Sequence, residues 1–293
     1  MLKISIVLIP IAANSAVFAQ DRWFQIEVSI FTNENSLDRL EEQWQAERTE
    51  LSYPDRMRRL NELADLLRTN DLTLASSSLF LTTEDELPDP EELEARIRAE
   101  SIAAIGPAPA TRGPGFSLFD FLREDFLLLP TSESEFRQTN QRLERSADHR
   151  LLFHGLWRQA VVQPENSIPV YIEGGLAYGD QHELQGSLTI RFNENEDRVV
   201  IDTNLWLTEF SIVENEDAAW ELPAVPNAVA EDAIQENTGL DYFPIMIYQM
   251  TQSREMRSTE FHYLDHPAMG LVIQVEPYTV PPVPLASAND EEF

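Results

Sequence analysis

The densest group of side chains that could do chemistry lies between Arg254 and Pro267. Histidines with carboxylates can hold a metal, and a serine beside a histidine can act as a nucleophile. In a strand, alternate residues share a face, so Ser258, Glu260 and His262 would project to the same side. The candidate ligand-binding residues of this segment are Arg257, Glu260, His262, Tyr263, Asp265 and His266.

The spacing in this segment gives little support to catalysis. A metal site would join His262 and His266, but its third ligand, Asp265 or His154, is poorly placed, because Asp265 falls on the opposite face unless the strand ends before it. Ser258 and His262 would stand about 13 Å apart at roughly 3.3 Å per residue, too far to touch. Glycosidase chemistry stays open because any two of 51 acidic residues could meet. The residues favour structural histidines in a turn, and no metal or cofactor is predicted.

A second cluster, between positions 145 and 159, combines arginine, histidine and tryptophan. Arginine pairs with carboxylates through a planar fork, and an indole face suits the C–H face of a sugar. The structural alternative is that Arg145 and Arg150 stand near a helix C-terminus, where positive charge is favoured. The candidate binding residues here are Arg150, His154, Trp157 and Arg158, accompanied by Arg145, His149 and Gln159.

Elements in the first half must help to position these clusters. Strict alternation predicts a half-buried strand from Trp23 to Phe31. Helical spacing or start signals predict helices in four segments: Leu37 to Trp44, Pro54 to Leu67, a short one from Asp89, and one from the Ser132 and Glu135 capping box to Ala147.

From Leu151 the hydrophobic period becomes that of strands, and turn segments separate the runs. Such an order indicates antiparallel connections, so the predicted class is α+β: an antiparallel sheet from the N-terminal strand and the C-terminal half, packed against helices from the first half. The predicted strands are Leu151 to Val162, Ile168 to Ile172, Glu183 to Phe192, Val199 to Phe210, Ser258 to Leu264 and Gly270 to Val275.

The N-terminal residues 1–19 have the pattern of a secretory signal peptide, with Lys3, an apolar run and small residues before the cleavage point. Because no other stretch approaches about 20 uninterrupted apolar residues, no membrane anchor is expected. The remaining chain is predicted to form one domain, 20–280, with a flexible Gly/Pro loop at about 106–115 and a disordered acidic tail at 281–293.

The composition excludes one large class of partner. The chain has 51 acidic and 21 basic residues, which gives a net charge of −30. Because such a charge repels the phosphate backbone, nucleic acid is not an expected partner. The single lysine, Lys3, and the acidity fit either salt adaptation or compositional drift. Because the chain has no cysteine, disulfides, thiolate metal sites and cysteine nucleophiles are excluded.

The segment from Arg257 to Pro267, with Met269-Gly270-Leu271-Val272-Ile273 after it, resembles the C-terminal signature of the CsiV family of periplasmic peptidoglycan-binding proteins. Three further segments agree in order: Trp23 to Val28, Leu151 to Gln159 and the strand start at Leu184-Gln185-Gly186. The chain departs from the family pattern at Glu255, Thr259 and His149, which affects ligand contacts rather than architecture.

The resemblance implies a non-catalytic periplasmic protein that binds peptidoglycan, supports cell shape and envelope integrity, and works beside wall-synthesis proteins. Wall sugars would lie on Trp157, Tyr171 or Trp206, and peptide carboxylates would bind arginines such as Arg158, Arg254 and Arg257. Two alternatives stay open: a wall hydrolase that depends on carboxylates or a metal, and a module that binds another envelope protein through a strand edge or the 106–115 loop.

Overall fold

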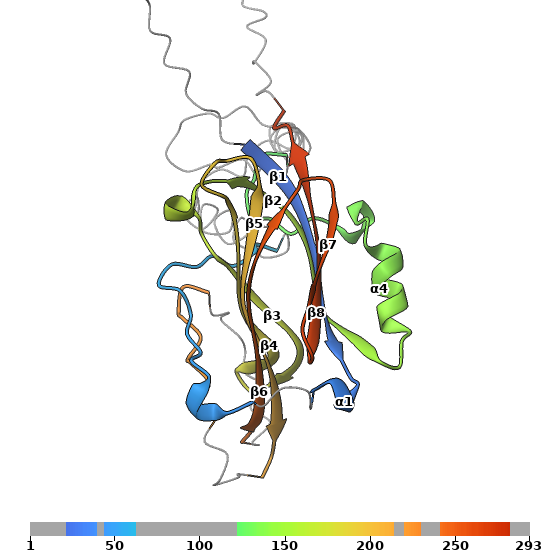
Figure 1. Cartoon of the computed structure of the whole chain (residues 1–293), viewed down its shortest axis with the longest axis vertical. Coiled ribbons are helices and arrows are strands. Elements are labelled where there is room, and N and C mark those ends of the chain that lie inside the picture. Colours follow the sequence, from blue (N-terminus) through green and yellow to red (C-terminus); the bar gives the residue numbers. More distant parts are fainter. Residues whose placement is uncertain (1–21, 40–43, 63–121, 214–219, 230–240, 282–293) are drawn as a thin grey trace, which may run out of the picture.

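Two antiparallel four-stranded sheets face each other in the computed structural model, which describes residues 22–39, 44–62, 122–213, 220–229 and 241–281 (Figure 1). Sheet A has the order β2-β1-β8-β7, and sheet B the order β3-β4-β5-β6. The strands of sheet A are β1 Arg22–Asn33, β2 His149–Val161, β7 Phe261–Asp265 and β8 Met269–Tyr278. Those of sheet B are β3 Val170–Tyr178, β4 Gln181–Phe192, β5 Val199–Ser211 and β6 Phe243–Met256.

Helical structure is sparse in the described residues. The helices are α1 Ser36–Arg39 and α4 Arg137–Glu144, with short 3-10 turns at Ala46–Arg48, Thr131–Glu133 and Pro164–Asn166. The predicted α+β class is therefore wrong, since the body of the protein is a mostly β arrangement of two sheets.

The helix predicted from Pro54 shows why this prediction failed. Its described part, up to Glu62, is not helical, and it bridges the edge strand β3 and the neighbouring segment through pairs of Arg58 with Val170 and Asn61 with Leu127. Leu60 is buried in the core. Its segment thus buries an apolar side chain without forming a helix, and its backbone makes long-range hydrogen bonds instead. Several predicted segments lie outside the described residues: the signal peptide, residues 63–67, the helix predicted from Asp89, the 106–115 loop and positions 282–293.

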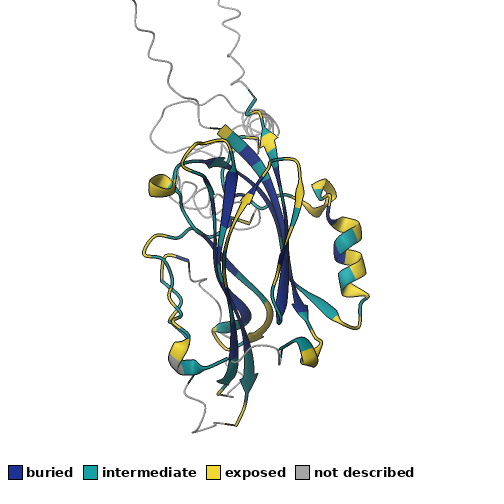
Figure 2. Cartoon of the chain, in the orientation of Figure 1, coloured by how far each residue is buried: buried dark blue, intermediate teal, exposed yellow. Residues whose placement is uncertain are grey.

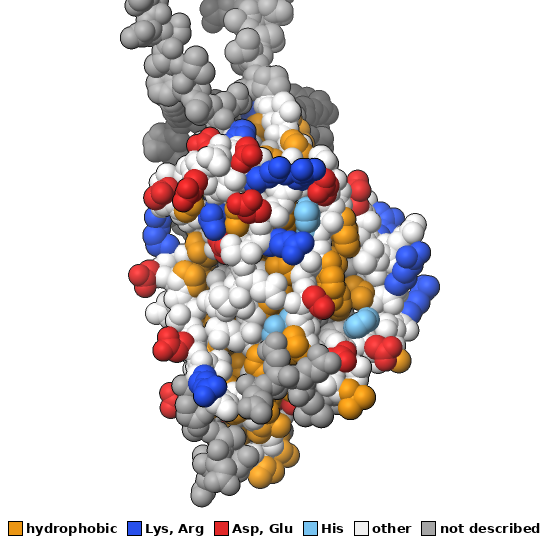
Figure 3. Space-filling view, in the orientation of Figure 1, with side chains coloured by type: hydrophobic (Ala, Val, Ile, Leu, Met, Phe, Trp, Pro, Cys, Tyr) orange, Lys and Arg blue, Asp and Glu red, His pale blue; other side chains and the backbone are white. Residues whose placement is uncertain are grey.

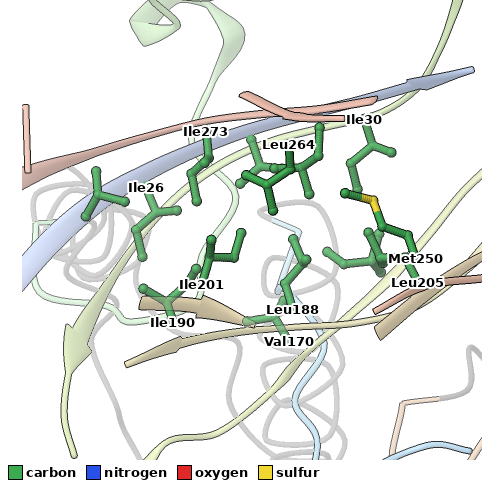
Figure 4. Packing of buried hydrophobic residues seen from close by; sticks show 14 of the residues in the cluster. Ile26, Ile30, Val170, Leu188, Ile190, Ile201, Leu205, Met250, Leu264 and Ile273 are labelled. Atoms are coloured by element: carbon green, nitrogen blue, oxygen red, sulfur yellow. The ribbon is translucent and has the colours of Figure 1, made fainter. Parts of the chain in front are cut away.

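The core fills the space between the two sheets (Figures 2 and 4). On β1, Phe24, Ile26, Val28 and Ile30 point into it, as their alternation predicted. The strand is not half-buried as expected, because Glu27, Ser29 and Phe31 on its other face are buried as well. Ile26, Ile30, Leu264 and Ile273 from sheet A lie opposite Val170, Leu188, Ile190, Ile201, Leu205 and Met250 from sheet B. The odd-numbered residues of β1 lie on the outer face of sheet A, where α4 packs.

Candidate functional site

The strand register decides which candidate side chains face the core and which face outward. In an antiparallel sheet, residues directly opposite each other project to the same side. His154 lies opposite Ser29 and Arg158 opposite Gln25, so both are on the outer face of sheet A. Trp157 lies opposite Ile26, inside the core.

Trp157 is completely buried, and its indole N–H donates to Gln159 Oε1 at 2.8 Å. Two other rings that the sequence offered for sugar stacking, Tyr171 and Trp206, are also buried, beneath Tyr53. None of these three rings presents a free face to a polymer.

Arg158 and Arg150 are both engaged within the protein. Arg158 is only 8% exposed; its Nε donates to Gln25 Oε1 at 3.0 Å and its guanidinium lies over the Tyr278 ring. Arg150 forms a two-point ion pair with Glu183, at 2.7 and 3.1 Å, which connects β2 to β4. This hydrogen-bonded pair raises the pKa of Arg150. Both arginines contribute to the structure around the sheets.

His154 belongs to a group of three polar side chains with Glu27 and Ser134. Its Nε2 lies 2.8 Å from Glu27 Oε1, and the Ser134 hydroxyl donates to the same oxygen at 2.5 Å. The Glu27 carboxylate also accepts the backbone N–H groups of Glu135 and Phe136, just before α4. Although burial raises the pKa of Glu27, the hydrogen bonds from His154, Ser134 and the two amides bring that pKa below its ordinary value.

This geometry is that of a helix cap supplied from another strand. The capping box predicted at Ser132 does not form: the side chain of Phe136, at the N-cap of α4, makes no capping bond, and Ser132 lies in the 3-10 turn before it. The Ser134 hydroxyl, which donates to Glu27, also lies 3.4 Å from His154 Nε2, so all three side chains meet at the start of α4.

The C-terminal cluster forms the edge strand β7 and the turn before it. Phe261 and Tyr263 lie two residues apart, so both project to the outer face, where Phe261 is 52% and Tyr263 46% exposed. We call this pair the β7 aromatic face. Among the aromatic side chains in the described ranges, these two are the exposed ones. Figure 3 shows hydrophobic side chains gathered in this region between β7 and α4.

The ring of Tyr263 is held by a ring stack and by a hydrogen bond. It lies parallel to Phe31, with centroids 6.2 Å apart, and its hydroxyl donates to Asp265 Oδ1 at 2.6 Å. Burial and the hydrogen bond with Asp265 raise the pKa of Tyr263, so the hydroxyl keeps its proton at neutral pH. Gly270 leaves room for the stack, because a Cβ there would lie 2.5 Å from the Phe31 ring and 3.0 Å from Tyr263.

The other residues of this cluster have different environments. The Arg257 side chain is 65% exposed and 3.9 Å from Glu260. His262 points toward the core side, opposite Ile273, and its Nε2 lies 3.7 Å from Glu260. His266 accepts the Ala268 N–H at Nδ1, and its Nε2 lies 3.1 Å from the Gln249 carbonyl oxygen, which gives it a structural place in the turn between β7 and β8.

The two predicted clusters do not form one groove. Arg158 is on β2 and Arg257 adjoins β7, and these strands are three spacings apart, about 14 Å at roughly 4.8 Å per spacing. Helix α4 packs across the outer face through Phe136 and Leu143 against Phe31 and Val272. Phe261 was not among the residues predicted from the sequence as ligand-binding, although its two-residue spacing from Tyr263 predicts a shared face.

Comparison with known proteins identifies the family. No curated protein and no solved structure matches the chain. Within the described residues, none of the helices is long and apolar enough to cross a membrane. A family model described as "Peptidoglycan-binding protein, CsiV" matches residues 1–278 and so includes both clusters and every strand described above. The chain therefore belongs to the CsiV family of peptidoglycan-binding proteins.

Proposed function

We propose that this protein binds peptidoglycan without cleaving it, and that the glycan lies on the β7 aromatic face. Family membership supports the ligand. The observation that carries the location is that Phe261 and Tyr263, the exposed aromatic residues of the described ranges, stand side by side within the segment that resembles the family signature.

The β7 aromatic face suits a glycan strand. Two residues along a strand span about 6.6 Å, so the rings form a short apolar strip on which the C–H faces of sugars can stack. Because Phe31 and Asp265 already fix the Tyr263 ring, little side-chain entropy is lost when a ligand covers it.

Arg257 supplies the matching charge. Its guanidinium is largely exposed, and its ion pair with Glu260 is loose at 3.9 Å. It is therefore available to carboxylates of the stem peptides, which a planar guanidinium binds well. Glycan on the rings and peptide on the arginine would together use both components of the wall.

The proposal includes a place and a role in the cell. A secretory signal pattern at residues 1–19 and a ligand outside the cytoplasm both support a periplasmic protein. In that compartment, a wall-binding protein would support cell shape and work beside wall-synthesis proteins. The proposal gives Glu27 and Ser134 a structural role, because the Glu27 carboxylate accepts the Ser134 hydroxyl and two backbone N–H groups at the start of α4.

Pull-down with purified sacculi tests the proposal. Protein that lacks residues 1–19 is incubated with sacculi over a series of salt concentrations, and the bound fraction is measured. We expect retention that is unchanged or stronger at moderate salt, because salt screens the repulsion between this anionic chain and wall carboxylates. Absence of retention at every salt concentration would refute binding, and release of soluble muropeptides, with or without chelator, would refute the non-catalytic part.

A further inference from the structure

A cavity of about 450 Å³ lies far from β7, where the edges of the two sheets meet. Strands β2 and β3 approach closely there: a Cβ on Gly174 would lie 2.2 Å from the Leu152 carbonyl oxygen. Residues 58–61 and 126–129 close the gap through backbone hydrogen bonds to β3, to β2 and to each other. We call this space the seam cavity. Its volume lies within the range of small-molecule sites, at about 300–1,000 Å³.

One wall of the seam cavity is apolar. Leu128, Leu152 and Phe153 line it, and Gly174 adds no side chain. Phe153 and Leu128 are partly buried hydrophobic residues that pack against the main core, so this wall is a rigid extension of it. A ligand that enters would therefore need an apolar face or a methyl group.

The lining also includes an ordered polar group. The Glu173 carboxylate pairs with Arg59 and accepts the Tyr171 hydroxyl at 3.0 Å. Burial, and then the charge of Glu173, raise the pKa of Tyr171, so this hydroxyl stays protonated and continues to donate. His182 Nδ1 lies 3.6 Å from Glu173, and this buried atom has no hydrogen-bond partner within the part of the chain that the structure describes.

The charges of the lining favour an uncharged ligand. Arg59 is already paired with Glu173 and also donates to the Val229 carbonyl oxygen at 3.1 Å. Glu62 adds a second negative charge to the lining, so an anionic peptide end would be repelled. A sugar hydroxyl both donates and accepts, and it can therefore bond to Glu173 and to the imidazole of His182 together.

We propose that the seam cavity binds an N-acetylated sugar at an end of the glycan, with its hydroxyls on Glu173 and His182 and its acetyl methyl against Leu152 and Phe153. This inference rests on the proposed function and adds a second site to it. The β7 aromatic face would bind the polymer along its side, and the seam cavity would select a chain end, because its volume accepts a short fragment.

The test uses triacetylchitotriose as the probe and cellotriose, which lacks the acetamido groups, as the matched control ligand. Isotope-labelled protein lacking residues 1–19 is titrated with each and followed by NMR. We expect the largest shifts with triacetylchitotriose at the amides of Gly174, Gly175 and His182, and roughly tenfold weaker binding of cellotriose, because the acetamido contacts are missing.

Variants test the seam cavity itself. His182→Ala should weaken triacetylchitotriose binding, followed at the amides of the cavity, roughly two- to tenfold, as expected for one neutral hydrogen bond. The exposed control Ile212→Ser, outside both proposed sites, should leave this binding unchanged. His182→Gln, which keeps a donor, should restore part of the affinity. Because the shifts of the unmodified protein are independent evidence, a His182→Ala variant that fails to fold does not remove the test.

Several outcomes would overturn the inference: no triacetylchitotriose binding, equal binding of cellotriose, or shifts confined to β7. If the protein then still binds sacculi, the seam cavity has failed and the proposed function stands. If sacculus binding is absent as well, both have failed.

Discussion

Removal of the β7 aromatic face should weaken sacculus binding strongly. The perturbation is the double variant Phe261→Ser with Tyr263→Ser. The two side chains are 52% and 46% exposed. Since an aromatic side chain has about 150–250 Å² of surface, roughly 75–125 Å² of each is available to a ligand.

A glycan that covers half of this available surface would remove about 75–125 Å² in total from water. At about 25 cal/mol per Å², that burial contributes about 2–3 kcal/mol, which corresponds to a roughly 30- to 160-fold loss of affinity in the double variant. The assay is the sacculus pull-down, with bound protein measured over a series of sacculus concentrations.

The matched control is Ile212→Ser with Val213→Ser, which removes two aliphatic side chains of 63% and 69% exposure just after the end of β5. This control should bind as the unmodified protein does. Tyr263→Phe, which keeps the ring and loses only the bond to Asp265, should bind nearly as well. Unchanged binding by a folded Phe261→Ser, Tyr263→Ser variant would refute our assignment of the glycan to this face.

Three further predictions concern the surroundings of this face. Arg257→Gln should weaken sacculus binding by about 1.5- to 5-fold, because an exposed ion pair contributes about 0.2–1 kcal/mol. The control Arg56→Gln removes another exposed arginine and should leave sacculus binding unchanged. Equal losses in the two variants would indicate a general charge effect. Gly270→Ala should cost about 1–3 kcal/mol of unfolding free energy by overpacking Phe31, and it should also weaken sacculus binding. The control Gly179→Ala, which would have no atom within 4 Å of its Cβ, should affect stability alone. If Gly270→Ala left sacculus binding unaffected, that result would contradict the need for the stack of Phe31 and Tyr263. Glu27→Gln should cost about 2 kcal/mol at neutral pH in urea unfolding. Because the pKa of Glu27 is lowered in the folded state, this difference should be full above the ordinary value of 4.5 and disappear as the pH falls through the folded pKa; a difference that persists in acid would contradict the capping role of the charged carboxylate.

Much of the sheet structure could be predicted from the sequence, because the alternation of apolar and polar residues along a strand is a local property of the chain. The runs predicted as strands contain or overlap seven of the eight strands, and the four β1 residues predicted to share a face, Phe24, Ile26, Val28 and Ile30, all lie in the core. The exception is β6, whose Pro244 and polar second half from Thr251 hide its pattern. Its buried residues, such as Met250, gain their environment from β5 and from the opposite sheet.

The candidate site was predicted only in part, because the face on which a side chain lies depends on register. Trp157 and Arg158 are neighbours in sequence, yet one is in the core and the other on the outer face. Tyr263 was predicted as a ligand residue and is exposed, while the support from Phe31 and Gly270 comes from strands distant in sequence.

By itself, the sequence determined the charge, the lack of thiols, the pattern of a secretory signal and the positions of most strands, since each is a property of composition or of local spacing. Only the tertiary structure decided that residues 54–62 join the sheet edges instead of forming a helix, and that Glu27 rather than Ser132 caps α4. The physical reason is that backbone and capping groups bond to whichever partner the fold brings near, and such partners can be more than a hundred residues away.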